Sequence, residues 1–167
     1  DMSVDCVSVD QLIKWIDGSR PVLVGFTATT VQIRTAAMIA SRVKDACPGI
    51  KTCVGGPHVA AMPRETLAEF PVFDFVVIGE GEGILARILG SLNNESALSE
   101  IVGVVVKGSG QVGMNRIEDL DALPFPAWED FDLTKYPGTP GEGVLTAAFF
   151  VVVRSATRSV AAAFFPW

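Results

Sequence analysis

Three continuous apolar segments, which begin near residues 22, 50 and 74, constrain the fold of this chain more than any other feature. Each is about as long as a strand, and such an uninterrupted apolar run is typical of a strand buried on both faces. The intervals between them are long enough for the crossover helices that parallel neighbours in a sheet require. The spacing therefore predicts an α/β fold with a doubly wound, mostly parallel sheet over residues 1–100.

The intervals carry the sequence signals of helices. Ser8 and Gln11 have the spacing of a capping box, and they open a segment in which Leu12, Trp15 and Ile16 would share one inner face. Apolar periodicity predicts the later helices, and Pro48-Gly49 ends the first of them. These later helices are expected over residues 30–47, 63–70 and 84–92.

The pattern changes after residue 100. Two short apolar runs at 102–106 and 111–114 flank a Gly-Ser-Gly turn and predict a β-hairpin. Pro124 and Pro126 then favour an extended, acidic and aromatic linker. We accordingly divide the chain into a sheet domain, a hairpin with its linker, and a final segment of different composition. Their ranges are 1–100, 101–137 and 138–167.

Charge and composition exclude several classes of function. The net charge is −6 and the 13 basic residues are scattered, which argues against a nucleic-acid partner. No apolar run reaches the roughly 18 residues expected of a membrane helix. The three cysteines form neither a disulfide framework nor a metal motif. Asp1, Asp5 and Asp10 stand where a secretory signal would be basic and apolar, so a cytoplasmic location is expected.

Residues suited to ligand contact follow the first two predicted strands. Thr27, Ala28 and Thr29 come after the first strand, where small hydroxyls either bind a polar group of a ligand or cap the next helix. Gly55 and Gly56 come after the second, and glycine permits close approach of the backbone to a ligand. In parallel sheets such strand ends share one edge, which is where open α/β sheets bind ligands.

The third strand ends in Gly79, Glu80, Gly81 and Glu82. The two carboxylates either contact a ligand or act at the N-terminus of the next helix, where negative charge suits the helix dipole. A catalytic acid–base pair is the weaker interpretation, so we assign no catalytic residue.

His58, the single histidine, follows Pro57 and the glycine pair. Its imidazole is interpreted either as a metal ligand or acid–base catalyst, or as the side chain of a loop residue held by Pro57 and a backbone carbonyl. No second histidine or cysteine stands at metal-ligand spacing from it, so we assign no metal site.

Four motifs in this order resemble the cobalamin-binding domain of cobalamin-dependent radical S-adenosylmethionine enzymes. They lie at residues 24–27, 54–58, 74–82 and 120–128, and the likeness covers about residues 1–137. The resemblance implies a Rossmann-like domain that binds cobalamin across the carboxyl edge of its sheet. It also implies which residues contact the cofactor: Thr27, Ala28, Thr29, Gly55, Gly56, Pro57, His58, Gly79, Glu80, Gly81 and Glu82.

The resemblance further implies a partner domain, a partial barrel in which three cysteines hold a [4Fe–4S] cluster that cleaves S-adenosylmethionine. That motif is expected near residue 155, but Ala156, Val160 and Ala163 stand at the spacing of its cysteines and cannot ligate iron. The chain is therefore expected to bind cobalamin for a methyl transfer or rearrangement without being catalytic by itself. The family's opening strand, which sits centrally in the sheet, is expected before residue 1.

Two alternatives remain open at this point. A flavodoxin-like domain would bind a nucleotide at the same edge, although Glu80 and Glu82 would repel its phosphate. A non-catalytic interaction module would use the acidic, Pro-rich linker to dock a partner. If Gly56 admits the ligand, a Gly56→Val variant is expected to lose binding while the fold stays intact.

Overall fold

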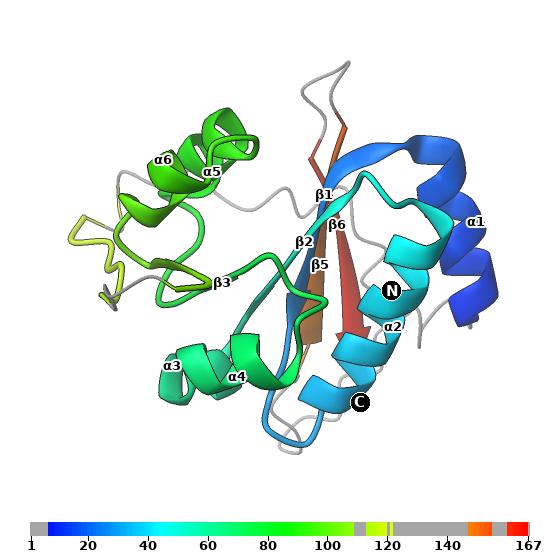
Figure 1. Ribbon diagram of the computed structural model, residues 1–167, viewed down its shortest axis with the longest axis horizontal. Helices are drawn as coiled ribbons and strands as arrows, with labels where there is room; N and C mark the ends of the chain where they lie inside the picture. Colours follow the sequence, from blue (N-terminus) through cyan, green and yellow to red (C-terminus); the bar gives the residue numbers. More distant parts are fainter. Residues whose placement is uncertain (1–6, 109–112, 120, 122–146, 155–159, 167) are drawn as a thin grey trace.

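The computed structural model describes residues 7–108, 113–119, 121, 147–154 and 160–166. A single sheet with the order β4-β3-β2-β1-β5-β6 runs through the molecule (Figure 1). The strands β1, β2 and β3 are parallel, whereas β4 pairs antiparallel with β3. The prediction of an α/β fold with a mostly parallel sheet is confirmed for these four strands. The strands are β1 (Pro21–Thr27), β2 (Lys51–Gly55), β3 (Phe75–Val77), β4 (Val104–Val106), β5 (Ala147–Arg154) and β6 (Val160–Pro166).

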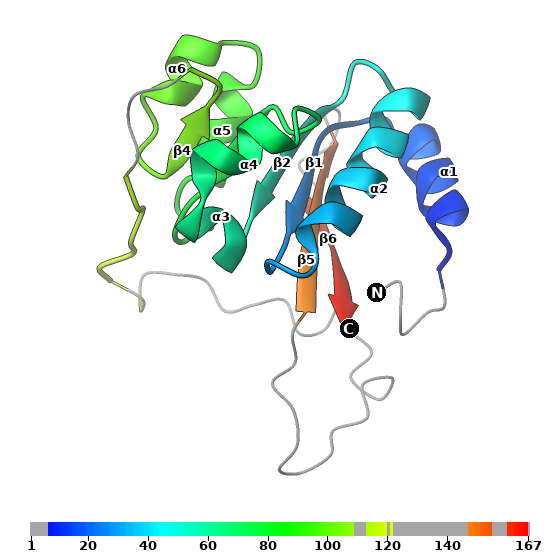
Figure 2. The ribbon, with the colours of Figure 1, turned by 60° about the horizontal axis from the view of Figure 1, so that its bottom comes forward.

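Helices cover both faces of the sheet, as a doubly wound fold requires. On one face α1 and α2 lie side by side, and an ion pair of 3.1 Å between Arg34 and Glu69 joins α2 to α4 (Figure 2). The opposite face carries α5 and α6 (Figure 1). The helices are α1 (Val9–Ser19), α2 (Ile33–Ala46), α3 (Pro57–Ala61), α4 (Pro63–Glu69), α5 (Leu85–Ser91) and α6 (Glu95–Ser99).

Two buried apolar clusters hold these layers together. Successive strand residues point to opposite faces, so Val54 belongs to the cluster under α1 to α4, while its neighbour Cys53 belongs to the cluster under α5 and α6. In the first cluster the rings of Phe26 and Phe73 meet edge to face with centroids 5.8 Å apart. The sheet is therefore buried on both faces, which is why its strands read as continuous apolar runs.

The first helix begins as its capping signal predicts. The Ser8 hydroxyl accepts a hydrogen bond from the Gln11 N–H (3.2 Å), and the Gln11 side chain accepts one from the Ser8 N–H (2.8 Å). Leu12 and Ile16 are buried, but Trp15 is 43% exposed, so its predicted place on the inner face is wrong. Val9 and Ile13 also pack against the core. The buried face of α1 is therefore formed by Val9, Leu12, Ile13 and Ile16, and Trp15 lies beside it.

The segment after residue 100 forms the edge of the sheet. Val105 of β4 pairs antiparallel with Val76 of β3. Residues 109–112, which include part of the predicted hairpin turn and the first half of its second strand, lie outside the described residues, as does most of the predicted linker. Asn115 forms a parallel bridge with Gly79. The hairpin and the linker thus stay predictions.

The second side of β1 is paired with the last part of the chain. Val24 of β1 pairs antiparallel with Val152 of β5, and β6 pairs antiparallel with β5. These two strands therefore extend the sheet at the place next to β1. The assignment of residues 138–167 to a second domain stays a prediction. In the part of the chain that the structure describes, no helix has the length and apolar character needed to cross a membrane.

Candidate cofactor-binding site

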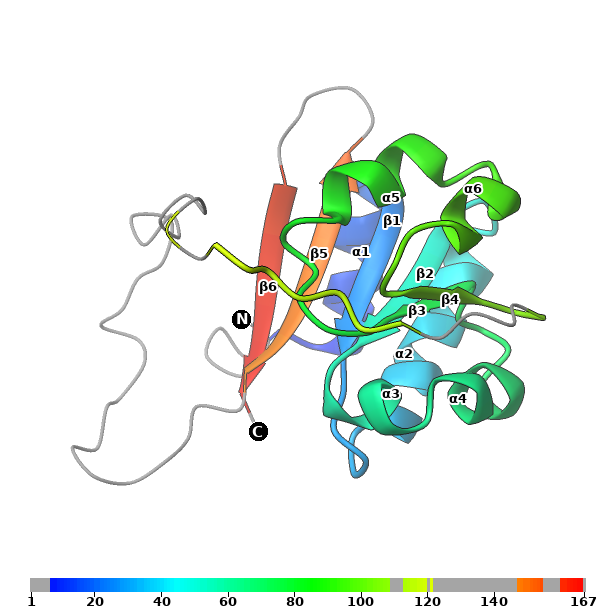
Figure 3. The same ribbon diagram turned by 90° about the vertical axis from the view of Figure 1, so that its left-hand side faces the viewer.

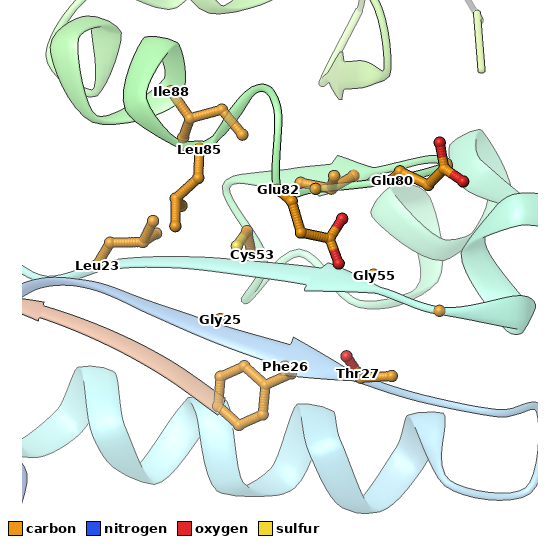
Figure 4. Close-up of a pocket in the computed structure, with 14 residues that line it drawn as sticks. Leu23, Gly25, Phe26, Thr27, Cys53, Gly55, Glu80, Glu82, Leu85 and Ile88 are labelled. Atoms are coloured by element: carbon orange, nitrogen blue, oxygen red, sulfur yellow. The ribbon is translucent and has the colours of Figure 1, made fainter. Parts of the chain in front are cut away.

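A pocket of about 420 Å³ opens at the carboxyl ends of β1, β2 and β3, between the sheet and α5 (Figure 4). Most of its walls are apolar side chains or glycine backbone, and its polar residues are one threonine and two glutamates. The lining residues are Leu23, Gly25, Phe26, Thr27, Cys53, Gly55, Gly56, Val77, Gly79, Glu80, Gly81, Glu82, Leu85 and Ile88.

Strand register builds the floor of this pocket. Gly25 pairs with Cys53, and two residues later Thr27 pairs with Gly55. Because alternate residues of a strand point to the same side, the four positions lie on one face of the sheet, and the two glycines leave space on it. A Cβ built on Gly55 would lie 3.5 Å from the Val77 carbonyl oxygen, which is an ordinary contact. The surrounding fold therefore accommodates a side chain at Gly55. Its glycine leaves open space above the floor.

Gly56 serves a different purpose. Its φ is +95°, and an added Cβ would lie 2.9 Å from both the Ala28 carbonyl oxygen and the Thr27 Cγ2. The backbone conformation and the close approach to the end of β1 both require glycine here. The expectation that a Gly56→Val variant keeps its fold is therefore wrong, because the side chain would collide with backbone as well as fill the pocket.

The turn from Gly79 to Glu82 forms one wall of the pocket, and its two carboxylates differ. Glu80 accepts a hydrogen bond from the Ile117 N–H, whereas Glu82 has no partner among the described residues. Figure 4 shows the Glu82 carboxylate directed toward β2 near Gly55, while the Glu80 carboxylate points away from the floor. Neither carboxylate caps α5, which begins without a side-chain cap. Glu82 is thus the carboxylate that faces the pocket.

Four of the predicted binding residues lie outside the pocket lining: Ala28, Thr29, Pro57 and His58. Ala28 is fully buried, and its carbonyl oxygen accepts a hydrogen bond from the His58 N–H at 3.2 Å. His58 is only 8% exposed, and its Nδ1 lies 3.2 Å from the Thr30 hydroxyl. These contacts hold the loop after β1 against α3. The role of the four residues as cofactor contacts stays a prediction.

The Thr29 hydroxyl is buried and has no hydrogen-bond partner within the described part of the chain. Such groups are rare, because an unsatisfied buried hydroxyl costs about 1–3 kcal/mol. It stands in the loop after β1, beside the pocket residue Thr27. The buried hydroxyl is closed off from the pocket, whose lining does not include Thr29.

Sequence reasoning missed the apolar half of the pocket, which includes Leu23, Cys53, Val77 and Ile88. A signal existed for Cys53 and Val77, because each stands two residues before a predicted binding glycine and so shares its face of the sheet. Burial, with a smaller effect of the Asp74 charge, raises the pKa of the Cys53 thiol to about 12. This residue therefore gives the floor a neutral thiol. The described residues contain no group of three or more His, Cys, Asp or Glu that could hold a metal ion.

Comparison with known proteins places this pocket in a family context. The B12 binding domain model matches residues 1–89, which include the three strand ends that form the pocket. The chain is 32% identical over 145 residues to an uncharacterized methyltransferase of Pyrococcus horikoshii, covering 83% of the chain and 31% of that protein. It is 29% identical over 144 residues to the anaerobic magnesium-protoporphyrin IX monomethyl ester cyclase of Rubrivivax gelatinosus, covering 81% and 26%.

A third relative is the cytidylyl-2-hydroxyethylphosphonate methyltransferase of Streptomyces wedmorensis, 25% identical over 114 residues, with 53% of the chain and 21% of that protein covered. The chain spans less than a third of the length of these three relatives. A match that covers 83% of 167 residues also includes residue 115, wherever it starts. The likeness therefore continues into the segment that follows β4.

Proposed function

The chain belongs to the B12-binding domain family, and we propose that it is the cobalamin-binding part of a larger cobalamin-dependent radical S-adenosylmethionine enzyme. The four motifs of the resemblance support the finer assignment. Two of the relatives are named methyltransferases and one is named a cyclase, which favours a methyl transfer or a related rearrangement as the reaction of the whole protein.

The observation that carries this proposal is the pocket floored by glycine at the carboxyl edge of the sheet. Its volume of about 420 Å³ lies within the range of small-molecule sites, and its apolar walls with a few polar groups are typical of them. Gly55 leaves the floor open where the fold would tolerate a side chain. The residues therefore fit part of a large, mostly uncharged cofactor better than they fit a compact anion.

The residues of this chain would bind and orient the cofactor. Gly55 would allow its approach to the backbone, Thr27 and Glu82 would accept hydrogen bonds from its hydroxyl or amide groups, and Leu85 would cover it from α5. When bound, cobalamin supplies the cobalt chemistry of methyl transfer. The cluster and S-adenosylmethionine would belong to a partner domain of the parent protein, because the C-terminal segment has no cysteine at the expected spacing.

A flavin or another nucleotide fits this pocket less well. Phosphate groups favour helix N-termini with free N–H groups and positive charge. Here the Glu82 carboxylate faces the pocket instead, and the pocket lining contains neither lysine nor arginine. The carboxylate suits the amide donors of cobalamin and would repel the terminal phosphate that a flavin nucleotide would place here.

The first prediction tests the pocket through Gly55. Purified chain titrated with hydroxocobalamin is expected to retain a stoichiometric amount after desalting, with a changed visible spectrum. A Gly55→Val variant is expected to lose this retention at least tenfold, because its methyl groups would occupy the open floor. Circular dichroism and the melting temperature should show that the variant is folded, since a Cβ at this position makes only ordinary contacts.

Gly18→Ala is the matched control. Gly18 lies on α1, which packs against the opposite face of the sheet, and an added Cβ would have no atom within 4 Å. This variant should bind hydroxocobalamin as the wild type does. Absence of retention by the folded wild-type chain would contradict the proposed function, and unchanged affinity of Gly55→Val would contradict the placement of the cofactor.

A further inference from the structure

Asn115 fills a space left open by two glycines, Gly79 and Gly103, which are distant from it in sequence. We call this space the seat of Asn115. Gly79 and Gly103 both have positive φ, +87° and +93°. A Cβ on Gly79 would lie 1.9 Å from the Asn115 carbonyl oxygen, and a Cβ on Gly103 would lie 2.7 Å from the Asn115 Cβ. Any side chain at either position would displace Asn115. The end of β3 and the turn before β4 are thus shaped to receive this residue.

Hydrogen bonds of Asn115 and Ile117 hold the segment 113–117 in that seat, where it crosses the carboxyl end of β3 (Figure 3). The Asn115 N–H donates to the Ile78 carbonyl at 3.2 Å, and the Glu80 N–H donates to the Asn115 carbonyl at 3.0 Å. The Asn115 side-chain amide donates to the Glu80 carbonyl at 2.5 Å. The Glu80 carboxylate accepts the N–H of Ile117. We call these contacts of Glu80, Asn115 and Ile117 the clasp.

The clasp holds the same turn that forms a wall of the pocket. Gly79 and Glu80 both line the pocket, yet β3 ends at Val77, so the sheet ladder does not fix them. The turn is held at the Gly81 carbonyl by the N–H groups of Ile84 and Leu85, and at Glu80 by Asn115. One side of the turn therefore faces the ligand site, and its other side faces residues 113–117.

We propose that Glu80 and Asn115 are positioning residues that couple occupancy of the cobalamin pocket to the seating of residues 113–117. The proposal rests on the proposed function, since it takes cobalamin as the ligand of the pocket. A ligand that orders the turn also stabilises the segment bound to it, and by linkage a seated segment raises the affinity for the ligand. In this arrangement Glu80 acts through the clasp, and Glu82 meets the ligand.

Hydrogen exchange followed by mass spectrometry on the full chain tests the coupling. In the wild type, saturating hydroxocobalamin is expected to slow exchange of the amides of Glu80, Asn115 and Ile117 at least threefold. Glu80→Ala is expected to speed exchange over residues 113–117 without ligand, and to weaken retention of hydroxocobalamin. Glu80→Gln should restore both properties in large part, because its amide oxygen can accept the Ile117 N–H.

Glu82→Ala is the matched control, since it removes the same charge from the same turn. It is expected to weaken hydroxocobalamin binding while exchange over residues 113–117 without ligand stays at the wild-type rate. Binding of hydroxocobalamin with unchanged exchange at these residues would overturn the coupling alone. Equal exchange in Glu80→Ala and wild type would overturn the clasp. Failure of the folded wild type to bind would overturn the proposed function and the coupling together.

Discussion

At the scale of single residues, Asp74 shows how one carboxylate fixes the start of β3. Its Oδ2 accepts hydrogen bonds from the Lys44 ammonium and from the Thr52 N–H, both at 2.8 Å. Burial by itself would raise the pKa of Asp74, but the Lys44 hydrogen bond, the Thr52 N–H and the charges of Lys44 and Lys51 together lower it. The carboxylate is therefore stabilised in its ionised form in the folded state.

The second prediction concerns the pH dependence that follows. Because the pKa is lower in the folded state, Asp74 stabilises the fold at pH values above its unfolded pKa of about 4, and this contribution is lost as the pH falls through the folded value. Asp74→Asn is expected to lower the free energy of unfolding by about 1–3 kcal/mol at pH 7. Urea unfolding at pH 7 and pH 3 should show the difference shrinking at acid pH.

Asp45→Asn provides the comparison for this measurement. Asp45 lies on the exposed side of α2 and has no partner in the described part of the chain. Its substitution should change the free energy of unfolding by less than about 0.5 kcal/mol. A loss in Asp74→Asn that is equally large at both pH values would contradict the linkage.

The two glycines after β2 show what residue identity alone leaves undecided. Both were predicted as ligand contacts from one pattern, and both line the pocket. Their roles differ because of neighbours that are distant in sequence. The backbone of Ala28 leaves no room for a side chain at Gly56, whereas the space over Gly55 is open. The seat of Asn115 was not predicted for the same reason, because it needs Gly79 and Gly103 at positive φ together.

At the scale of elements, local signals predicted well wherever they were strong. The capping box gave the start of α1, and the apolar runs gave the starts of β1, β2 and β3 to within about one residue. The five-residue helices α3 and α6 were not predicted, because so few residues cannot show a 3.6-residue period. The pairing of β5 with β1 was not predicted either, since a continuous apolar run does not reveal its partner.

The third prediction tests the contribution of the capping box to α1. Ser8→Ala removes the acceptor for the Gln11 N–H, which lies at 3.2 Å. The free energy of unfolding should fall by about 1 kcal/mol, as is typical for the loss of an N-cap. Chemical denaturation measures this, and Ser8→Asp, which retains an acceptor, should unfold close to wild type. Equal loss in both variants would contradict a capping role.

At the scale of the whole molecule, the sheet joins the two ends of the described chain. β1 is paired with β2 on one side and with β5 on the other. Without β5, the backbone groups on one side of a buried apolar strand would have no strand partner. Such an edge is a template for pairing with another chain.

The fourth prediction follows from that edge. A chain shortened after residue 146 loses β5 and β6, and it is expected to melt at lower temperature and to associate as its concentration rises. A chain shortened after residue 159 keeps β5 on β1 and should be affected less. Differential scanning fluorimetry and light scattering compare the three lengths. Identical melting and mass for all three would show that β5 does not protect β1.

The cofactor pocket also has a place in the energetics of the whole fold. Leu23, Cys53 and Ile88 line the pocket, and they also belong to the buried cluster under α5 and α6. A molecule seated there would cover apolar surface that is continuous with the protein's own interior. Binding would then carry the negative heat-capacity change that accompanies burial of such surface. The bound cofactor would thus extend the apolar core, and the free energy of binding would depend on temperature through the same heat-capacity effect as the free energy of folding.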